Sequence, residues 1–172
     1  FIDLFKKAGC KHVIMTNSSG CVEKTWDIGD LMLITGHIDY SFRFSNDDPE
    51  IIQDNRYDLN LLNRIEQIAI KENIVLRKGN YAWTTGPTYE TPSEIVDIKN
   101  LGGHAVGMSG LPEIERIYEL DMKMIGLCCL TNYASGLSGS KLTHDEVVDT
   151  AKNYQQNFIH LLHAIIENML FD

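Results

Sequence analysis

Short apolar runs of strand length recur along the chain, and polar or glycine-containing turns separate them. Four nearly continuous runs and one shorter run predict strands, because a strand buried in a sheet needs little alternation with polar residues. They are His12–Thr16, Asp30–Ile34, Tyr81–Thr85, Met122–Thr131 and, shorter, Ala105–Met108. The polar segment Ser41–Arg56, rich in Asp and Asn, predicts an exposed loop.

Amphipathic segments lie between these runs. From Tyr57 to Asn73 the apolar positions recur every three or four residues, which is typical of a helix with one buried face. Shorter helices are predicted over Phe1–Ala8 and from Pro112 onward.

Two helices also carry start signals. In Thr91-Pro92-Ser93-Glu94 the threonine is placed to cap, proline suits the first turn and glutamate completes a capping box. This helix is expected to end at Gly102-Gly103. Thr143-His144-Asp145-Glu146 predicts a second capping box at the start of the longest helix. One stripe of that helix predicts core packing: Val147, Ala151, Tyr154, Phe158, Leu161 and Ile165.

The alternation of strands and helices favours an α/β fold with a mixed, largely parallel sheet flanked by helices. We find no internal repeat and no linker in the 172 residues, so the sequence predicts a single domain over residues 1–172. In such sheets, ligands bind at the carboxyl ends of the strands.

Composition narrows the function classes. Fifteen basic and 24 acidic residues give a net charge of −9, which argues against nucleic-acid binding because such proteins need clustered Lys and Arg. No apolar stretch approaches the ~20 residues that cross a membrane. The four Cys form no CxxC pair, so we expect thiols in a reducing, cytoplasmic compartment and no metal site.

Polar or glycine-containing segments follow four of the predicted strands. They are Thr16–Gly20, Gly86–Thr91, Gly107–Ser109 and Leu130–Asn132. A single such segment is most simply a turn. Four of them at strand ends favour a binding site, because a scaffold alone does not need polar groups at every such position.

These segments, in this order and at this approximate spacing, resemble the trimeric purine nucleoside phosphorylases. The most specific match is Gly86-Pro87-Thr88-Tyr89-Glu90-Thr91, and the resemblance extends over essentially the whole chain. It implies phosphorolysis: phosphate displaces a purine from C1′ of a ribonucleoside and yields ribose 1-phosphate, a reaction of purine salvage. It also implies a homotrimer that binds a purine nucleoside and phosphate and needs no cofactor.

The resemblance begins partway along the family's pattern. Relatives carry roughly another hundred residues before the equivalent of Phe1, including a Gly-rich loop and an Arg-x-His segment that bind phosphate. We therefore expect the 172-residue chain alone, as an N-terminally truncated domain, to be inactive or very weak. Charge-assisted contacts to phosphate are typically worth ~1.5–3 kcal/mol each.

For the purine, the resemblance implies three contacts. Asn132 is expected to bond N7 and O6 and to stabilise the leaving base, and Glu90 to accept hydrogen bonds from N1–H and the guanine amino group. Tyr89 is expected to lie against the base. Without the resemblance, a turn Asn, a solvated Glu near a helix start and a core aromatic are the simpler interpretations.

For the sugar and phosphate, the resemblance implies five further residues. Met108 is expected under the ribose, Gly20 at the nucleoside site and His144 at the 5′-hydroxyl. Ser109 and the backbone N–H of Ser18 are expected to bind phosphate. Backbone amides bind anions without net positive charge, which is compatible with an acidic chain.

The chain also departs from the family pattern. Cys21 stands where relatives have glycine; if that position is left-handed, a side chain costs about 1 kcal/mol, so we expect strain there. Gly110 replaces the usual threonine after Ser109 and is expected to loosen the turn. Two alternatives stay open. One is a methylthioadenosine phosphorylase-like enzyme, disfavoured by Glu90 and Asn132; the other is a non-catalytic nucleoside-binding remnant.

Overall fold

The computed structural model describes residues 1–42, 49, 51–53, 56–138 and 144–168, with backbone only at 144–151 and 153. The strands are β1 (His12–Cys21), β2 (Leu31–Asp39), β3 (Ile51–Ile52), β4 (Leu76–Trp83), β5 (Gly103–Gly107) and β6 (Lys123–Tyr133). The helices are α1 (Ile2–Lys7), α2 (Leu59–Lys71), α3 (Pro92–Asn100), α4 (Leu111–Glu119) and α5 (His144–Asn168).

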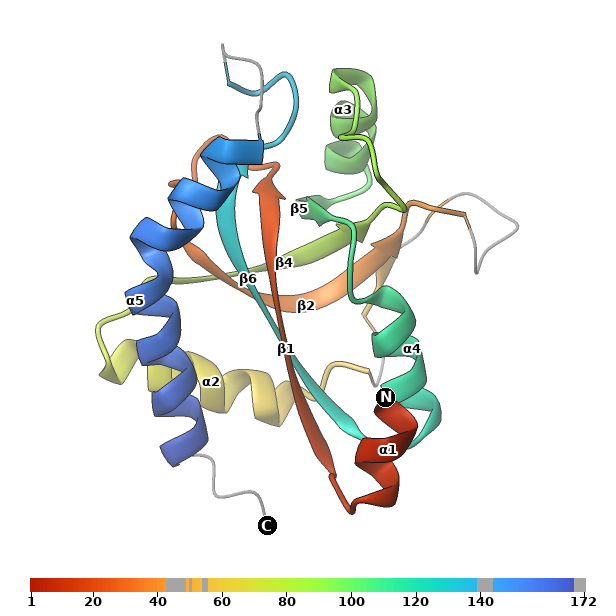
Figure 1. Cartoon of the computed structure of the whole chain (residues 1–172), viewed down its shortest axis with the longest axis vertical. Coiled ribbons are helices and arrows are strands. Elements are labelled where there is room, and N and C mark those ends of the chain that lie inside the picture. The colour runs from red at the N-terminus through yellow and green to blue at the C-terminus, as the bar shows by residue number, and fades with distance from the viewer. Residues whose placement is uncertain (43–48, 50, 54–55, 139–143, 169–172) are drawn as a thin grey trace.

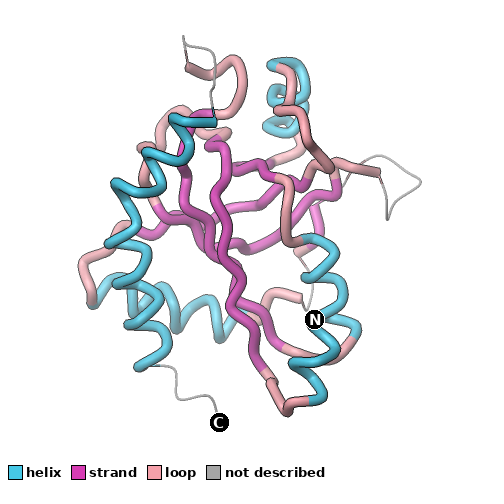
Figure 2. The backbone as a smooth tube through the Cα atoms, in the orientation of Figure 1, coloured by secondary structure: helices cyan, strands magenta, loops and turns pink. Residues whose placement is uncertain are grey.

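The strands form one sheet in the order β3-β2-β4-β5-β1-β6, which curls until β2 also pairs with β6 (Figures 1 and 2). The longer pairings, β1–β6, β2–β4 and β4–β5, are parallel, and the three short ones are antiparallel. This confirms the expected α/β class with a mixed, largely parallel sheet flanked by helices.

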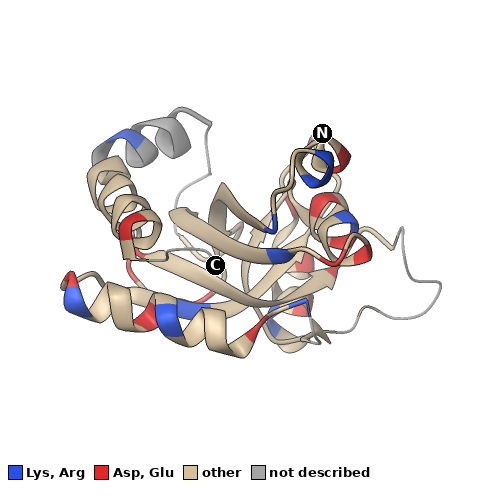
Figure 3. Cartoon of the chain, turned by 90° about the horizontal axis from the view of Figure 1, so that it is seen from below, with Lys and Arg blue, Asp and Glu red and all other residues tan. Residues whose placement is uncertain are grey.

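Helices surround the curled sheet. Helix α5 packs on β6 and α2, whereas α1 and α4 lie together on another side (Figure 1). Charged residues are concentrated on the helices, and the strands carry few (Figure 3). The buried apolar residues of the strands and helices form a main core and a smaller second cluster, which includes Ile95 and Ile98 of α3. In the part of the chain that the structure describes, no helix is both long and apolar enough to cross a bilayer.

The capping signal at Thr91 is confirmed. Helix α3 begins after Thr91, whose side chain accepts a hydrogen bond from the N–H of Glu94, while the Glu94 carboxylate accepts one from the N–H of Thr91. Helix α2 begins after Asp58, which caps it. The second predicted capping box starts at Thr143, which lies outside the described residues.

Strand β1 is longer than the sequence predicts. The prediction ended it at Thr16 and made Asn17–Gly20 a turn, which is wrong: the strand continues to Cys21 and pairs with β6 along its length. The expected strain at Cys21 is wrong for the same reason. Cys21 is buried in extended strand and is not among the residues with positive φ.

Strands β2 and β3 also differ from the prediction. β2 continues from Ile34 to Asp39, because the imidazole of His37 is buried with hydrogen-bond partners, Tyr57 at 2.7 Å and Glu115 at 3.2 Å. The predicted loop Ser41–Arg56 includes the short strand β3, which pairs with β2. Hydrogen bonding across the fold thus offsets the cost of burying these polar groups.

Candidate functional site

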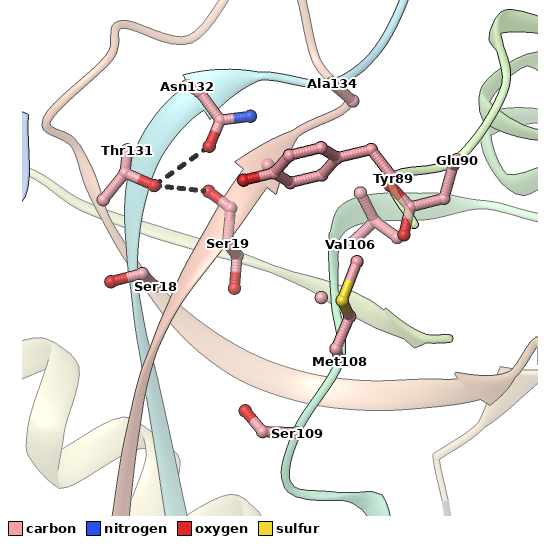
Figure 4. Close-up of a pocket in the computed structure, with 12 residues that line it drawn as sticks. Ser18, Ser19, Tyr89, Glu90, Val106, Met108, Ser109, Thr131, Asn132 and Ala134 are labelled. Carbon is pink, nitrogen blue, oxygen red and sulfur yellow. Dashed lines mark hydrogen bonds between the residues drawn. The ribbon is translucent and has the colours of Figure 1, made fainter. Parts of the chain in front are cut away.

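A pocket of about 250 Å³ opens where four strands end (Figure 4). Its walls come from the end of β1, the segment after β4, the end of β5 with the turn that follows, and the end of β6. The lining residues are Ser18, Ser19, Gly20, Tyr89, Glu90, Val106, Gly107, Met108, Ser109, Thr131, Asn132 and Ala134. The pocket therefore lies at the carboxyl ends of strands, as expected for such a sheet.

The structure brings together every residue that the sequence assigned to the purine and the phosphate. Those lining the pocket are Gly20, Ser18, Tyr89, Glu90, Met108, Ser109 and Asn132. His144 is the first residue of α5, and its side chain lies outside the described residues.

A bulge between β1 and β6 sets the direction of Asn132. Ser19 pairs with Leu130 and Gly20 with Asn132, so Thr131 is the extra residue on β6. The buried Thr131 hydroxyl donates to Oδ1 of Asn132 at 3.0 Å and reaches the carbonyl of Ser19 at 3.5 Å. Bulges are frequent beside active sites because they redirect a side chain.

The Asn132 amide keeps hydrogen-bonding capacity for a ligand. Its Nδ2 donates to the carbonyl of Tyr133 at 3.0 Å, and Oδ1 accepts from Thr131. An amide offers two donors and two acceptor positions, so one of each remains. Asn132 is half-buried at the pocket wall and can therefore present both a donor and an acceptor.

Glu90 lies across the pocket, on the segment between β4 and α3. Its Oε1 accepts a hydrogen bond from the hydroxyl of Thr84 at 2.7 Å, and Thr84 is itself buried. Oε2 makes no hydrogen bond with the described residues. The capped start of α3 at Thr91 follows directly in the chain, so the backbone beside Glu90 is ordered, and one carboxylate oxygen is available as an acceptor.

An aromatic ring and a thioether provide the apolar walls. The Tyr89 ring, 42% exposed, extends from the Glu90 side toward the β1–β6 edge (Figure 4). Met108 packs over Gly86, where an added Cβ would lie 2.5 Å from its sulfur. The pocket thus combines flat apolar surfaces with a few directed polar groups, which is typical of small-molecule sites.

Ser109 stands at the far end of the pocket, just before α4. Its carbonyl accepts a hydrogen bond from the buried phenol of Tyr81 at 2.8 Å, and its N–H approaches the same oxygen at 3.4 Å. Gly110 then caps α4 with φ of 103°, a conformation that suits glycine. The glycine that was expected to loosen this turn is the residue that its backbone requires.

The described residues at this end of the pocket offer an anion dipoles and no formal positive charge. None of the described lining residues is Lys or Arg. Ser109 provides a hydroxyl at this end of the pocket, in the turn that leads into α4. Across the described residues, no group of three or more His, Cys, Asp or Glu side chains could hold a metal ion.

Several residues in and around the pocket received no individual role from the sequence, although Ser19 and Thr131 lie in two of the segments that it singled out. Thr131 and Thr84 act through hydrogen bonds that depend on a bulge and on a turn between strands. Ser19, Val106 and Ala134 line the walls. The position of Thr131, at the end of an apolar run beside Asn132, was the available signal; nothing local distinguishes Thr84 from Thr85.

Comparison with known proteins identifies relatives over nearly the whole chain. Residues 2–167 match the model of the phosphorylase superfamily. A purine nucleoside phosphorylase 1 of Bacillus subtilis is 34% identical over 96% of this chain and 64% of its own length. A probable S-methyl-5′-thioinosine phosphorylase of Methanothermobacter thermautotrophicus is 31% identical over 95% of this chain and 59% of its own.

Solved structures agree. The purine nucleoside phosphorylase of Schistosoma mansoni in complex with inosine superposes with a TM-score of 0.88 and 26% identity, covering 99% of this chain and 66% of that one. The family resemblance found in the sequence is thereby confirmed. The chain spans about two thirds of the length of these relatives.

Proposed function

Because the chain belongs to the phosphorylase superfamily, we propose that it is the nucleoside-binding part of a purine nucleoside phosphorylase acting on 6-oxopurine nucleosides, inosine and guanosine. Phosphate displaces the base from C1′ and yields the free purine and ribose 1-phosphate. No cofactor is required. We also propose that residues 1–172 are one domain and that the enzyme is a homotrimer.

One observation carries the proposal: an amide and a carboxylate from distant segments, Asn132 and Glu90, face the same pocket. A 6-oxopurine presents an acceptor pair at O6 and N7 and a donor at N1–H. The Asn132 donor suits the first edge, and the available Glu90 oxygen suits the second. The hydrogen bond donated by Asn132 strengthens as the glycosidic bond breaks and negative charge moves into the base, while Glu90 fixes the orientation of the base through N1–H.

The remaining lining residues fit the sugar and the phosphate. Tyr89 would cover the base and Met108 the ribose face. Ser109 and the backbone N–H of Ser18 would hold phosphate at the far end. The protein's contribution is thus positioning and electrostatics, with no covalent intermediate.

The direct test is phosphorolysis by the full-length gene product. We expect inosine plus phosphate to yield hypoxanthine and ribose 1-phosphate, with Asn132→Ala and Glu90→Ala each losing at least tenfold in kcat/KM. Nucleoside binding without turnover in the full-length product would support the non-catalytic alternative. No binding of inosine or hypoxanthine would refute the proposal.

A second candidate substrate is S-methyl-5′-thioinosine, which relatives at 31% identity are named for. It carries the same hypoxanthine base, so Asn132 and Glu90 do not separate the two substrates. The difference lies at the 5′ position, where His144 is proposed to reach a hydroxyl. A comparison of kcat/KM for inosine and S-methyl-5′-thioinosine distinguishes the two. Methylthioadenosine should be turned over poorly, because its 6-amino group replaces the O6 acceptor that Asn132 is proposed to bond and its N1 has no hydrogen to donate to Glu90.

A further inference from the structure

Two hydroxyl groups at the end of β4 brace opposite halves of the pocket. We propose that Tyr81 and Thr84 are positioning residues, Tyr81 for the phosphate-binding turn at Ser109 and Thr84 for the base-binding carboxylate of Glu90. This inference rests on the proposed function and adds two residues to it, neither of which lines the pocket.

Tyr81 is completely buried, and its phenol is within hydrogen-bond distance of the Ser109 backbone. It donates to the Ser109 carbonyl at 2.8 Å and lies 3.4 Å from the Ser109 N–H, while a Cβ on Gly107 would lie 2.6 Å from its oxygen. Burial raises the pKa of Tyr81, so the phenol stays neutral and can donate and accept together. The buried phenol of Tyr81 therefore holds the backbone of the exposed Ser109 in place.

Thr84 holds Glu90, on the opposite side of the pocket from Ser109. Its hydroxyl donates to Oε1 of Glu90 at 2.7 Å, and its backbone N–H donates to the Gly107 carbonyl at 2.9 Å. The hydroxyl occupies one carboxylate oxygen and restricts the rotation of the side chain, so that Oε2 is directed to the ligand. Without it, a half-buried Glu90 would sample several rotamers, and each binding event would have to order it again.

Because the two braces act on different ligands, their removal should separate the two substrates. In the full-length protein with inosine and phosphate, we expect Tyr81→Phe to raise the phosphate KM about 3- to 10-fold and to leave the inosine KM within about twofold. Thr84→Val should raise the inosine KM by a similar factor and leave the phosphate KM within about twofold. Thr84→Ser, which keeps the hydroxyl, should restore the inosine KM.

Tyr40→Phe is the matched control. Its phenol also donates a hydrogen bond, to Asp97 at 2.8 Å, but this bond is exposed and lies outside the pocket. It should change neither KM. If Tyr81→Phe and Thr84→Val instead change both KM values in parallel, or change neither, the positioning roles are refuted and both residues are structural only.

Amide hydrogen exchange tests the same claim without substrate. Tyr81→Phe should speed exchange at residues 107–110, and Thr84→Val at residues 89–91, each leaving the other segment unchanged. If the protein turns over no nucleoside, the proposed function fails, yet this local pattern would still support the two braces. Uniform acceleration, or none, would refute them.

Discussion

A methyl group on Gly20 would lie 3.3 Å from Nδ2 of Asn132 and equally close to Val106. Gly20 on β1 pairs with Asn132 on β6 just beyond the bulge. The absence of a side chain on Gly20 therefore makes room for the Asn132 amide. The geometry of the pocket wall at Asn132 therefore depends on a glycine that has no side chain of its own.

Gly20→Ala should displace the Asn132 amide by a few tenths of an ångström. We expect kcat/KM for inosine to fall about tenfold, because positioning errors of this kind weaken transition-state interactions, while the phosphate KM changes little. Steady-state kinetics at saturating phosphate checks this. A thermal unfolding midpoint close to that of the parent is the control, and an unchanged kcat/KM would show that Asn132 tolerates the shift.

Asn132→Asp replaces a donor with an acceptor while Thr131 keeps its hydrogen bond to the remaining oxygen. The preference should move toward 6-aminopurine nucleosides, which present a donor where inosine presents O6. The measurement is the ratio of kcat/KM for adenosine and inosine. If the ratio stays as in the parent, Asn132 does not face the base.

Removal of the α3 cap should weaken the segment that carries Glu90. Thr91→Ala deletes one half of the capping box and should lower the free energy of unfolding by about 1 kcal/mol. Urea denaturation gives this value. Thr91→Ser keeps the cap hydroxyl and is the control; a loss of equal size in both variants would mean that the methyl group, and not the cap, is responsible.

Glu115 should make stability depend on pH. The hydrogen bond from His37, with Arg56 beside it, lowers the pKa of Glu115 below its ordinary value of 4.5, although burial opposes the shift. Its stabilisation is therefore complete above about pH 4.5 and is lost as the pH falls through the lower folded pKa. Glu115→Gln should lower the free energy of unfolding by on the order of 2 kcal/mol at pH 7. It should also make that free energy less dependent on pH in the acid range.

The control for this prediction lies on the same helix. Glu119 pairs with Arg116 at the surface, where an exposed ion pair contributes less than about 1 kcal/mol. Glu119→Gln should leave the stability curve between pH 3 and 7 nearly unchanged. Equal acid sensitivity in the Glu115→Gln variant and the parent would contradict the argument.

The four thiols should differ sharply in reactivity. Cys10 is exposed, whereas burial raises the pKa of Cys21 to about 11 and that of Cys128 to about 12, and also raises that of Cys129. Only Cys10 should react quickly with a disulfide reagent at pH 8, because thiolate and access are both needed. Cys10→Ser should abolish the fast phase, and denaturant should expose the remaining three. A persistent fast phase in that variant would contradict the assignment.

The local elements were predictable because their signals are local. The Thr91 capping box, the apolar periodicity of α2 and the apolar run of β6 each depend on residues a few positions apart. Strand ends were less accurate. β1 and β2 continue through polar residues, because partners distant in the sequence complete their hydrogen bonds.

By itself, the sequence determined the α/β class, the family and the residue types that gather at the strand ends, since spacing and order carry that information. Only the tertiary structure decided how the sheet closes between β2 and β6, that Thr131 bulges to aim Asn132, and that Tyr81 and Thr84 stand behind Ser109 and Glu90. Those relationships join residues up to 112 positions apart. No local pattern specifies them, because they arise from register and packing once the chain has folded.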